Sequence, residues 1–174
     1  PKRYERFIES LNDAIPERLI EAKEWIDFIC ERSRDMQKVI QGINASQIPL
    51  RVTHNDTKIN NILFDRHEPK VKCLVDLDTV MPGSLLYDFG DAVRFGCSTA
   101  KEDETDLSLV DVNLDYFEAF TKGFMRPLKD TMTQTEFDYL AWSSILITLE
   151  LGMRFLMDYL LGDHYFKIHR EKHN

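Results

Sequence analysis

Cysteine, proline and glycine are all scarce in this sequence, which has 3, 6 and 7 of them among 174 residues. So few Gly and Pro exclude collagen-like and low-complexity chains. The cysteines, Cys30, Cys73 and Cys97, are odd in number and widely spaced, which argues against a disulfide scaffold and a cysteine zinc site. Unpaired cysteines fit a reducing compartment, so we expect a cytoplasmic protein, with Cys73 as an inert core residue of an apolar strand.

Basic residues are also in the minority, with 22 Lys and Arg against 30 Asp and Glu and a formal net charge of −8. A broad nucleic-acid surface needs clustered Lys and Arg, so we expect no nucleic-acid partner. The most apolar stretch, residues 139–161, is interrupted by Glu150, Arg154 and Asp158. Because three charges at membrane depth would be costly, we predict a buried helix there and no membrane partner.

Apolar residues recur at steps of three and four along much of the chain, a period typical of amphipathic helices. This period predicts helices at 3–12, from Pro16 to near Gly42, at 86–95, at 111–124, and from Thr135 onward with Thr133 or Thr135 as N-cap. Short apolar runs predict strands at 50–54, 62–65 and 71–75, whereas 81–84 is predicted to be a loop. We therefore expect a predominantly helical α+β fold with a small β-patch, and we expect Trp25 and Trp142 in its core.

Polar residues gather between the predicted strands. Asp56 and Asn61 lie in a segment flanked by two strands, and Asp76 follows the third strand. This order could bring two carboxylates and one amide oxygen into one small volume. Oxygen ligands of this kind suit Mg²⁺, which takes one or two carboxylates together with substrate phosphates and water.

The spacing His54-x-Asp56-x-x-x-x-Asn61 resembles the catalytic-loop pattern of the kinase-like fold. Together with Asp76 in Val-Asp-Leu-Asp, it is similar to the aminoglycoside phosphotransferase and choline kinase group. The longer runs Arg51–Asp65 and Val75–Gly96 resemble the N-acetylhexosamine 1-kinase branch of that group, which makes sugar 1-phosphates from N-acetylglucosamine or N-acetylgalactosamine and ATP. The resemblance covers most of residues 45–166 and implies a protein-kinase-like C-terminal lobe, in which a β-hairpin or β-patch carries the catalytic and metal loops.

The resemblance also implies roles for the polar residues. Asp56 would accept the proton of the sugar hydroxyl, and an ordinary carboxylate suffices because positioning dominates phosphoryl transfer. Lys58 would approach the γ-phosphate of ATP as a cation. Asn61 and Asp76 would hold magnesium that bridges the ATP phosphates.

Four further residues are also given roles. His54 would be structural and pack the loop, and Asp88 would support the catalytic loop by hydrogen bonding. Asp78 is either a metal or sugar ligand or a plain loop carboxylate. Arg154 either binds sugar hydroxyls or the N-acetyl carbonyl, or forms an i, i+4 ion pair with Glu150 on the helix surface.

A G-x-G-x-x-G loop and a Val-Ala-Ile-Lys-like strand are both missing before His54. We therefore expect residues 1–174 to be the C-terminal lobe of a longer enzyme, with the nucleotide-binding N-terminal lobe outside this chain and the isolated chain inactive. Alternatives are a kinase of another small acceptor (aminoglycoside, choline or homoserine) and a sugar-binding lobe without catalysis. A sulfatase is disfavoured, because no Cys or Ser begins a Cys/Ser-x-Pro-x-Arg motif.

Overall fold

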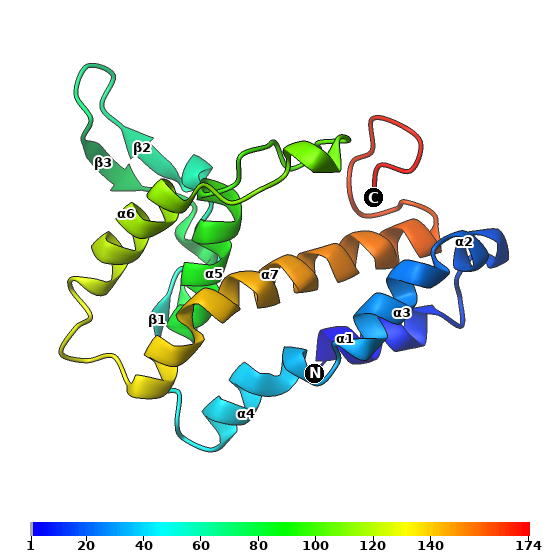
Figure 1. The fold of residues 1–174 in the computed structure, drawn as a ribbon, viewed down its shortest axis with the longest axis horizontal. Helices are drawn as coiled ribbons and strands as arrows, with labels where there is room; N and C mark the ends of the chain where they lie inside the picture. The colour runs from blue at the N-terminus through cyan, green and yellow to red at the C-terminus, as the bar shows by residue number, and fades with distance from the viewer. Residues whose placement is uncertain (1) are drawn as a thin grey trace. The chain divides into compact units, whose positions relative to one another are not determined.

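The computed structural model describes residues 2–174, which divide into two compact units (Figure 1). Unit 1 comprises residues 2–41 and 148–174, and unit 2 comprises Gly42–Ile147. The last helix, α7 (Gln134–Leu161), contributes to both units. Helices form most of the regular structure, and the described strands all lie in unit 2, so the prediction of a predominantly helical α+β chain is confirmed.

Unit 1 is built around an apolar core between α1 (Lys2–Ser10), the helices that follow it and the end of α7. The prediction of one helix from Pro16 to near Gly42 is wrong. The chain instead forms several pieces: α2 (Pro16–Glu21), α3 (Lys23–Glu31), the 3-10 turn η1 (Asp35–Gln37) and α4 (Lys38–Asn44).

The helix is interrupted where Ala22 and Arg32 leave the helical conformation, with ψ of 10° and 6°. These interruptions redirect the chain, so that Ala22 and Ile29 enter the same core as Phe7. An apolar period of three and four continues across such turns, which is why the sequence pattern does not reveal them. From α7 the core receives Met153, Leu156, Tyr159 and Leu160.

The segment after α7 is fastened to the helix end by a buried carboxylate. Asp158 is 5% exposed and accepts hydrogen bonds at 2.8–3.0 Å from the backbone N–H groups of His164, Tyr165 and Phe166. The side-chain amide of Asn174 also donates to it, at 3.0 Å. A charged acceptor with several N–H donors is a strong arrangement, so this carboxylate fixes the C-terminal segment on unit 1.

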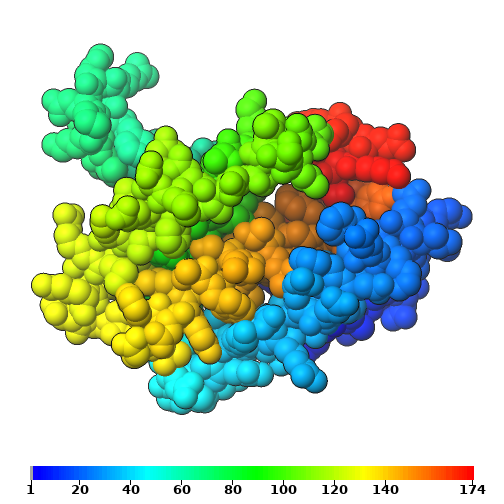
Figure 2. Space-filling view, viewed as in Figure 1, coloured from blue at the N-terminus to red at the C-terminus, as the bar shows by residue number. Residues whose placement is uncertain are grey.

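Unit 2 contains two small antiparallel sheets. One pairs β1 (Arg51–Thr53) with β4 (Met81–Gly83), and the other is a hairpin of β2 (Ile62–Phe64) and β3 (Val71–Leu74). The predicted strands are confirmed, and the hairpin protrudes from the rest of the unit in Figures 1 and 2. Between and after the strands lie the 3-10 turns η2 (Ile59–Asn61) and η3 (Leu77–Thr79).

The prediction of a loop at 81–84 is wrong, because β4 occupies 81–83. Pro and Gly lower strand propensity, but β1 offers a partner, with Thr53 opposite Met81. A Cβ on Gly83 would lie 2.4 Å from Thr53 Oγ1 and 3.0 Å from Asn55 Oδ1. The glycine therefore permits close approach of β4 to the chain that follows β1.

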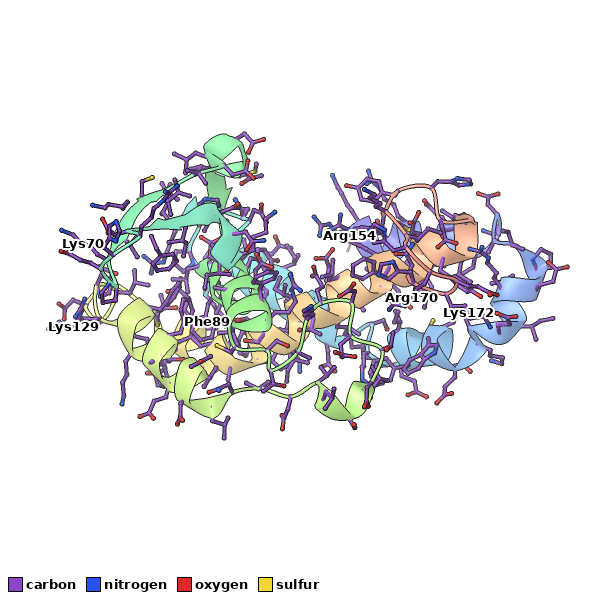
Figure 3. The ribbon with its side chains drawn as sticks, turned by 90° about the horizontal axis from the view of Figure 1, so that it is seen from above. Lys70, Phe89, Lys129, Arg154, Arg170 and Lys172 are labelled. Carbon is purple, nitrogen blue, oxygen red and sulfur yellow. The ribbon has the colours of Figure 1, made fainter. Side chains whose placement is uncertain are left out.

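Three helices complete unit 2: α5 (Leu85–Gly96), α6 (Leu114–Met125) and the first part of α7. Phe89 of α5 is fully buried (Figure 3) and contacts the aromatic rings of α6, namely Phe117, Phe120 and Phe124, at centroid distances of 5.1–6.2 Å. Gly90 faces α7, where a Cβ would lie 2.5 Å from the carbonyl oxygen of Ser143. These contacts fix α5, whose acidic side chains bind the segment that carries the candidate site. The 3-10 turn η4 (Leu107–Leu109) lies between α5 and α6.

The N-terminus of α7 follows its predicted cap. The N–H of Glu136 donates to Thr133 Oγ1 at 3.2 Å, and the Glu136 carboxylate accepts from the N–H of Thr133 at 2.8 Å. This reciprocal pair is a capping box. By length and composition alone α7 could also cross a membrane, a property that it shares with core helices of soluble proteins.

Three expectations about buried residues need correction. Cys73 is exposed rather than in the core, as are the other three residues of β3. Trp25 is 54% exposed on α3, and Trp142 is half-buried. Apolar character alone does not determine burial, since much of a protein surface is apolar.

Candidate functional site

Residues 54–61, which we call the 54–61 loop, connect β1 to β2 and lie against α5. Asp88 in the first turn of α5 accepts hydrogen bonds from the backbone N–H groups of His54 at 2.8 Å and Asn55 at 2.7 Å. Burial raises the pKa of the Asp88 carboxyl, and the two N–H groups act in the opposite direction. Asp88 thus binds two consecutive backbone N–H groups at the entry to the loop.

The entry to the loop has an unusual backbone. Asn55 has a φ of 65°, in the left-handed region that Asn tolerates better than most residues. Its side-chain amide donates to the carbonyl oxygen of Thr79 at 2.9 Å, and Thr79 Oγ1 donates to the carbonyl oxygen of His54 at 2.6 Å. Asn55 was not among the predicted site residues; its only signal in the sequence is the preference of Asn for such turns.

Asp56, Lys58 and Asn61 meet within the loop. Asp56 Oδ2 lies 2.9 Å from Lys58 Nζ and accepts a hydrogen bond of 2.9 Å from Asn61 Nδ2. The same amide donates to the backbone oxygen of Asp56, also at 2.9 Å. Both side-chain contacts use Oδ2, and the Asp56 side chain is 29% exposed.

Electrostatics keep this cluster charged. Burial acts to raise the pKa of Asp56, but the hydrogen bonds from Lys58 and Asn61 outweigh it and hold the pKa below its ordinary value. The hydrogen bond to Asp56 raises the pKa of Lys58, and the charges of Asp76 and Asp91 act in the same direction. At neutral pH the loop therefore presents a carboxylate and an ammonium side by side.

Asp76 follows β3 with left-handed dihedrals, φ 63° and ψ 53°. Its neighbour Val75 donates its N–H to the backbone oxygen of Asn61 at 3.0 Å, and His54 Nε2 lies 3.2 Å from the carbonyl oxygen of Val75. These contacts join the end of the hairpin to both ends of the 54–61 loop. His54 thus occupies a packing position, and its buried Nδ1 has no hydrogen-bond partner within residues 2–174.

The oxygen atoms of Asn61 and Asp76 fit a magnesium ion that takes only some of its ligands from the protein. In the described part of the chain, no group of three His, Cys, Asp or Glu side chains could hold a metal by itself. Asn61 and Asp76 offer an amide and a carboxylate oxygen, and Mg²⁺ ordinarily takes its remaining ligands from water and phosphates. Asp78 is exposed in η3.

Arg154 is not among the residues that unit 2 brings together, because it belongs to unit 1. It lies beside the C-terminal segment (Figure 3), with its guanidinium carbon 5.4 Å from the ring centroid of Phe166 and 5.9 Å from that of Tyr165. Glu150, the alternative partner expected one helical turn away, forms its ion pair with Arg3.

Two acidic residues near the loop were missed by the sequence analysis. Asp91, one turn after Asp88, accepts the N–H of Thr57 at 2.9 Å. Glu136, with a fully buried side chain, accepts two hydrogen bonds of 2.8 Å from the guanidinium of Arg51, the first residue of β1. For Asp91 the spacing i, i+3 from Asp88 was an available signal, whereas the partners Arg51 and Glu136 are too far apart in sequence for any local pattern.

The chain also matches a known protein family. Residues 8–128 match the model of the family described as "Phosphotransferase enzyme family" (APH). The match covers more than half of the chain and includes the 54–61 loop, Asp76 and Asp88.

Proposed function

Because the chain belongs to the phosphotransferase enzyme family, a group of ATP-dependent kinases of small molecules, we propose that it forms the acceptor and metal lobe of a kinase for the anomeric hydroxyl of an N-acetylhexosamine. The observation that carries the chemistry is the cluster of Asp56, Lys58 and Asn61 in a loop supported by Asp88. The sugar is supported by the resemblance of Arg51–Asp65 and Val75–Gly96 to the N-acetylhexosamine 1-kinase branch.

In the proposed reaction the carboxylate of Asp56 takes the proton of the sugar hydroxyl. The hydroxyl oxygen forms a bond to the γ-phosphorus as the bond from that phosphorus to the bridging oxygen of ADP breaks. Positioning and electrostatics dominate such a transfer, and the low pKa of Asp56 keeps the acceptor of the proton ionised.

Lys58 and the metal residues would manage the phosphate charge. Lys58 lies beside Asp56, so its ammonium would be close to a γ-phosphate that meets the hydroxyl at Asp56. Asn61 and Asp76 would hold Mg²⁺, which neutralises phosphate charge when it is bound. Asp78 is proposed as a sugar-binding residue of unit 2. The planar guanidinium of Arg154, in unit 1, suits a carbonyl or hydroxyl groups.

The nucleotide is proposed to be held largely by a further lobe of the same polypeptide. The β2–β3 hairpin supports this, because apolar side chains on its two strands are about half exposed: Leu63, Phe64, Val71 and Leu74. Exposed apolar side chains of this kind would suit contact with another lobe. We propose a cytoplasmic location, without nucleic-acid or membrane partners, from the acidic composition and the unpaired cysteines.

The test is a panel of acceptors with the full-length polypeptide and MgATP, with measurement of ADP and location of the new phosphate. The panel contains N-acetylglucosamine, N-acetylgalactosamine, an aminoglycoside, choline and homoserine. Formation of a sugar 1-phosphate supports the proposal, and exclusive use of another acceptor refutes the sugar assignment. The 174-residue chain alone is expected to give negligible transfer.

A magnesium titration of the same panel tests the metal residues. Asp76→Asn is expected to raise the Mg²⁺ concentration for half-maximal activity by about tenfold or more, because one of two protein ligands loses its charge. Asp115→Asn, an exposed carboxylate at the start of α6, is the matched control. If the two variants respond alike to magnesium, the assignment of Asp76 is wrong.

A further inference from the structure

Asp91 lies one helical turn after Asp88 on α5 and contacts a different part of the 54–61 loop. Its Oδ2 accepts the backbone N–H of Thr57 at 2.9 Å. Thr57 Oγ1 donates to the backbone oxygen of Asp88 at 2.6 Å. The loop is therefore attached to α5 at two places: at its entry through Asp88 and at Thr57 through Asp91.

The second oxygen of Asp91 is also engaged. Oδ1 accepts from Arg94 Nη2 at 3.2 Å, and Arg94 Nη1 donates to Glu102 Oε1 at 2.7 Å. The side chains of Asp91 and Arg94 are 20% and 16% exposed, whereas that of Glu102 is 47% exposed. A continuous polar chain thus runs from Glu102 through Arg94 and Asp91 to the backbone of Thr57.

Thr57 is the single residue between Asp56 and Lys58, so its backbone conformation sets the relative orientation of these two side chains. We propose that Asp91 is a positioning residue that fixes the spacing of Asp56 and Lys58 through the N–H of Thr57, and that Arg94 orients Asp91 for this task. The catalytic consequence of this inference rests on the function proposed above, but the positional part does not.

An ordinary surface ion pair is the competing explanation. Asp91 and Arg94 are spaced i, i+3, and exposed pairs of this kind contribute little. Two observations favour the positioning role: the pair is mostly buried, and Asp91 directs its other oxygen to the loop backbone rather than to solvent. Without Asp91 the half-buried N–H of Thr57 would lose this acceptor, and the backbone between Asp56 and Lys58 could shift. Small displacements of reacting groups lower rates strongly.

The experiment measures residue-resolved hydrogen–deuterium exchange of the ligand-free full-length polypeptide together with steady-state kinetics. In Asp91→Ala the amide of Thr57 is expected to exchange about tenfold faster, as loss of one charge-assisted hydrogen bond implies. The amides of His54 and Asn55, which Asp88 holds, should keep their protection. We expect kcat to fall about 10²-fold, with the KM values for ATP and acceptor unchanged.

Graded variants separate positioning from general damage. Asp91→Asn keeps an acceptor oxygen and should restore part of both the Thr57 protection and kcat, and Arg94→Gln should fall between Asp91→Asn and wild type. Glu118→Gln on α6, whose carboxylate pairs with Lys122 on the surface, is the control and should match wild type.

Two results would overturn the proposal. One is wild-type exchange at Thr57 in Asp91→Ala; the other is equal loss of protection at His54, Asn55 and Thr57, which would indicate a loosened unit and no specific contact. If Asp91→Ala does not fold, Asp91→Asn and Arg94→Gln decide by the same criteria. If the wild-type enzyme uses no acceptor of the panel, the proposed function fails. The exchange rate of the Thr57 amide then decides by itself whether Asp91 positions the loop.

Discussion

The 54–61 loop and the β2–β3 hairpin are neighbours in sequence but are stabilised in opposite ways. The loop has irregular backbone, and its N–H groups are held by the carboxylates of Asp88 and Asp91. The hairpin has regular backbone pairing, yet side chains such as Leu63 and Leu74 remain about half exposed. Polar contacts to α5 thus order the backbone of the proposed reacting groups, whereas the hairpin keeps exposed apolar side chains.

The proposed site spans both regions. Asp56, Lys58 and Asn61 come from the loop, and Asp76 comes from the end of the hairpin. The hydrogen bond from the N–H of Val75 to the backbone oxygen of Asn61 joins them. A change in either region can therefore reach the site, but we expect the two regions to fail in different ways.

The largest effect is expected from Asp56→Asn, which removes the proposed base and leaves the attachment of the loop intact. Asp88 binds backbone N–H groups and not this side chain, so the fold should persist. We expect kcat of the full-length enzyme to fall about 10³-fold, the range typical for loss of a general base. Steady-state kinetics and circular dichroism of the same sample check both statements.

The control for this variant is Asp13→Asn, an exposed carboxylate in unit 1. It should match wild type in both measurements. Retained turnover in Asp56→Asn would show that another group, or none, takes the proton.

The sequence predicts the parts of unit 2 that depend on local order. β1, β2 and β3 and helix α5 occur close to their expected positions, because each combines a clear apolar pattern with turn residues at its ends. β4 is different: Met81–Gly83 becomes a strand only because β1 lies beside it. The breaks at Ala22 and Arg32 are likewise invisible to a period that continues through them.

The contacts of the candidate site also divide into local contacts, which the sequence predicts, and tertiary contacts, which it does not. The spacing of Asp56 and Asn61 was enough to predict that they meet, because one short loop contains both. The contact of Asp91 with Thr57 depends on how α5 lies across the loop, and that of Glu136 with Arg51 joins residues from distant parts of the chain. Contacts set by tertiary packing leave no mark on the local pattern.

A smaller effect, on stability, is expected from Glu136→Gln, which removes the ion pair that attaches β1 to α7. Glu136 is fully buried and binds Arg51 in a bidentate ion pair. Breaking a buried pair typically costs about 3 kcal/mol or more of unfolding free energy. Chemical denaturation at pH 7 measures the loss.

The same variant has a defined pH dependence. Burial acts to raise the pKa of Glu136, but Arg51 and the N–H of Thr133 outweigh it and hold the pKa below the ordinary 4.5. The contribution is therefore complete above about pH 4.5, the unfolded value, and is lost as pH falls through the lower folded pKa. The stability difference between wild type and Glu136→Gln should thus shrink below pH 4.5. Asp27→Asn, in a surface pair with Lys23, should show no such difference, and a constant difference for Glu136→Gln would contradict the ion-pair explanation.

The smallest effect on stability is expected in the hairpin itself. Phe64 is 52% exposed, so Phe64→Ser should change the unfolding free energy of the 174-residue chain by no more than about 0.5 kcal/mol. The same substitution at the buried Phe89, which packs against three rings of α6, should cost about 3 kcal/mol or more. In the full-length polypeptide Phe64→Ser should raise the KM for ATP, because the hairpin is proposed to be covered by the nucleotide-binding lobe. Equal destabilisation by the two substitutions would show that the hairpin is packed already, and the contrast between loop and hairpin would then no longer hold.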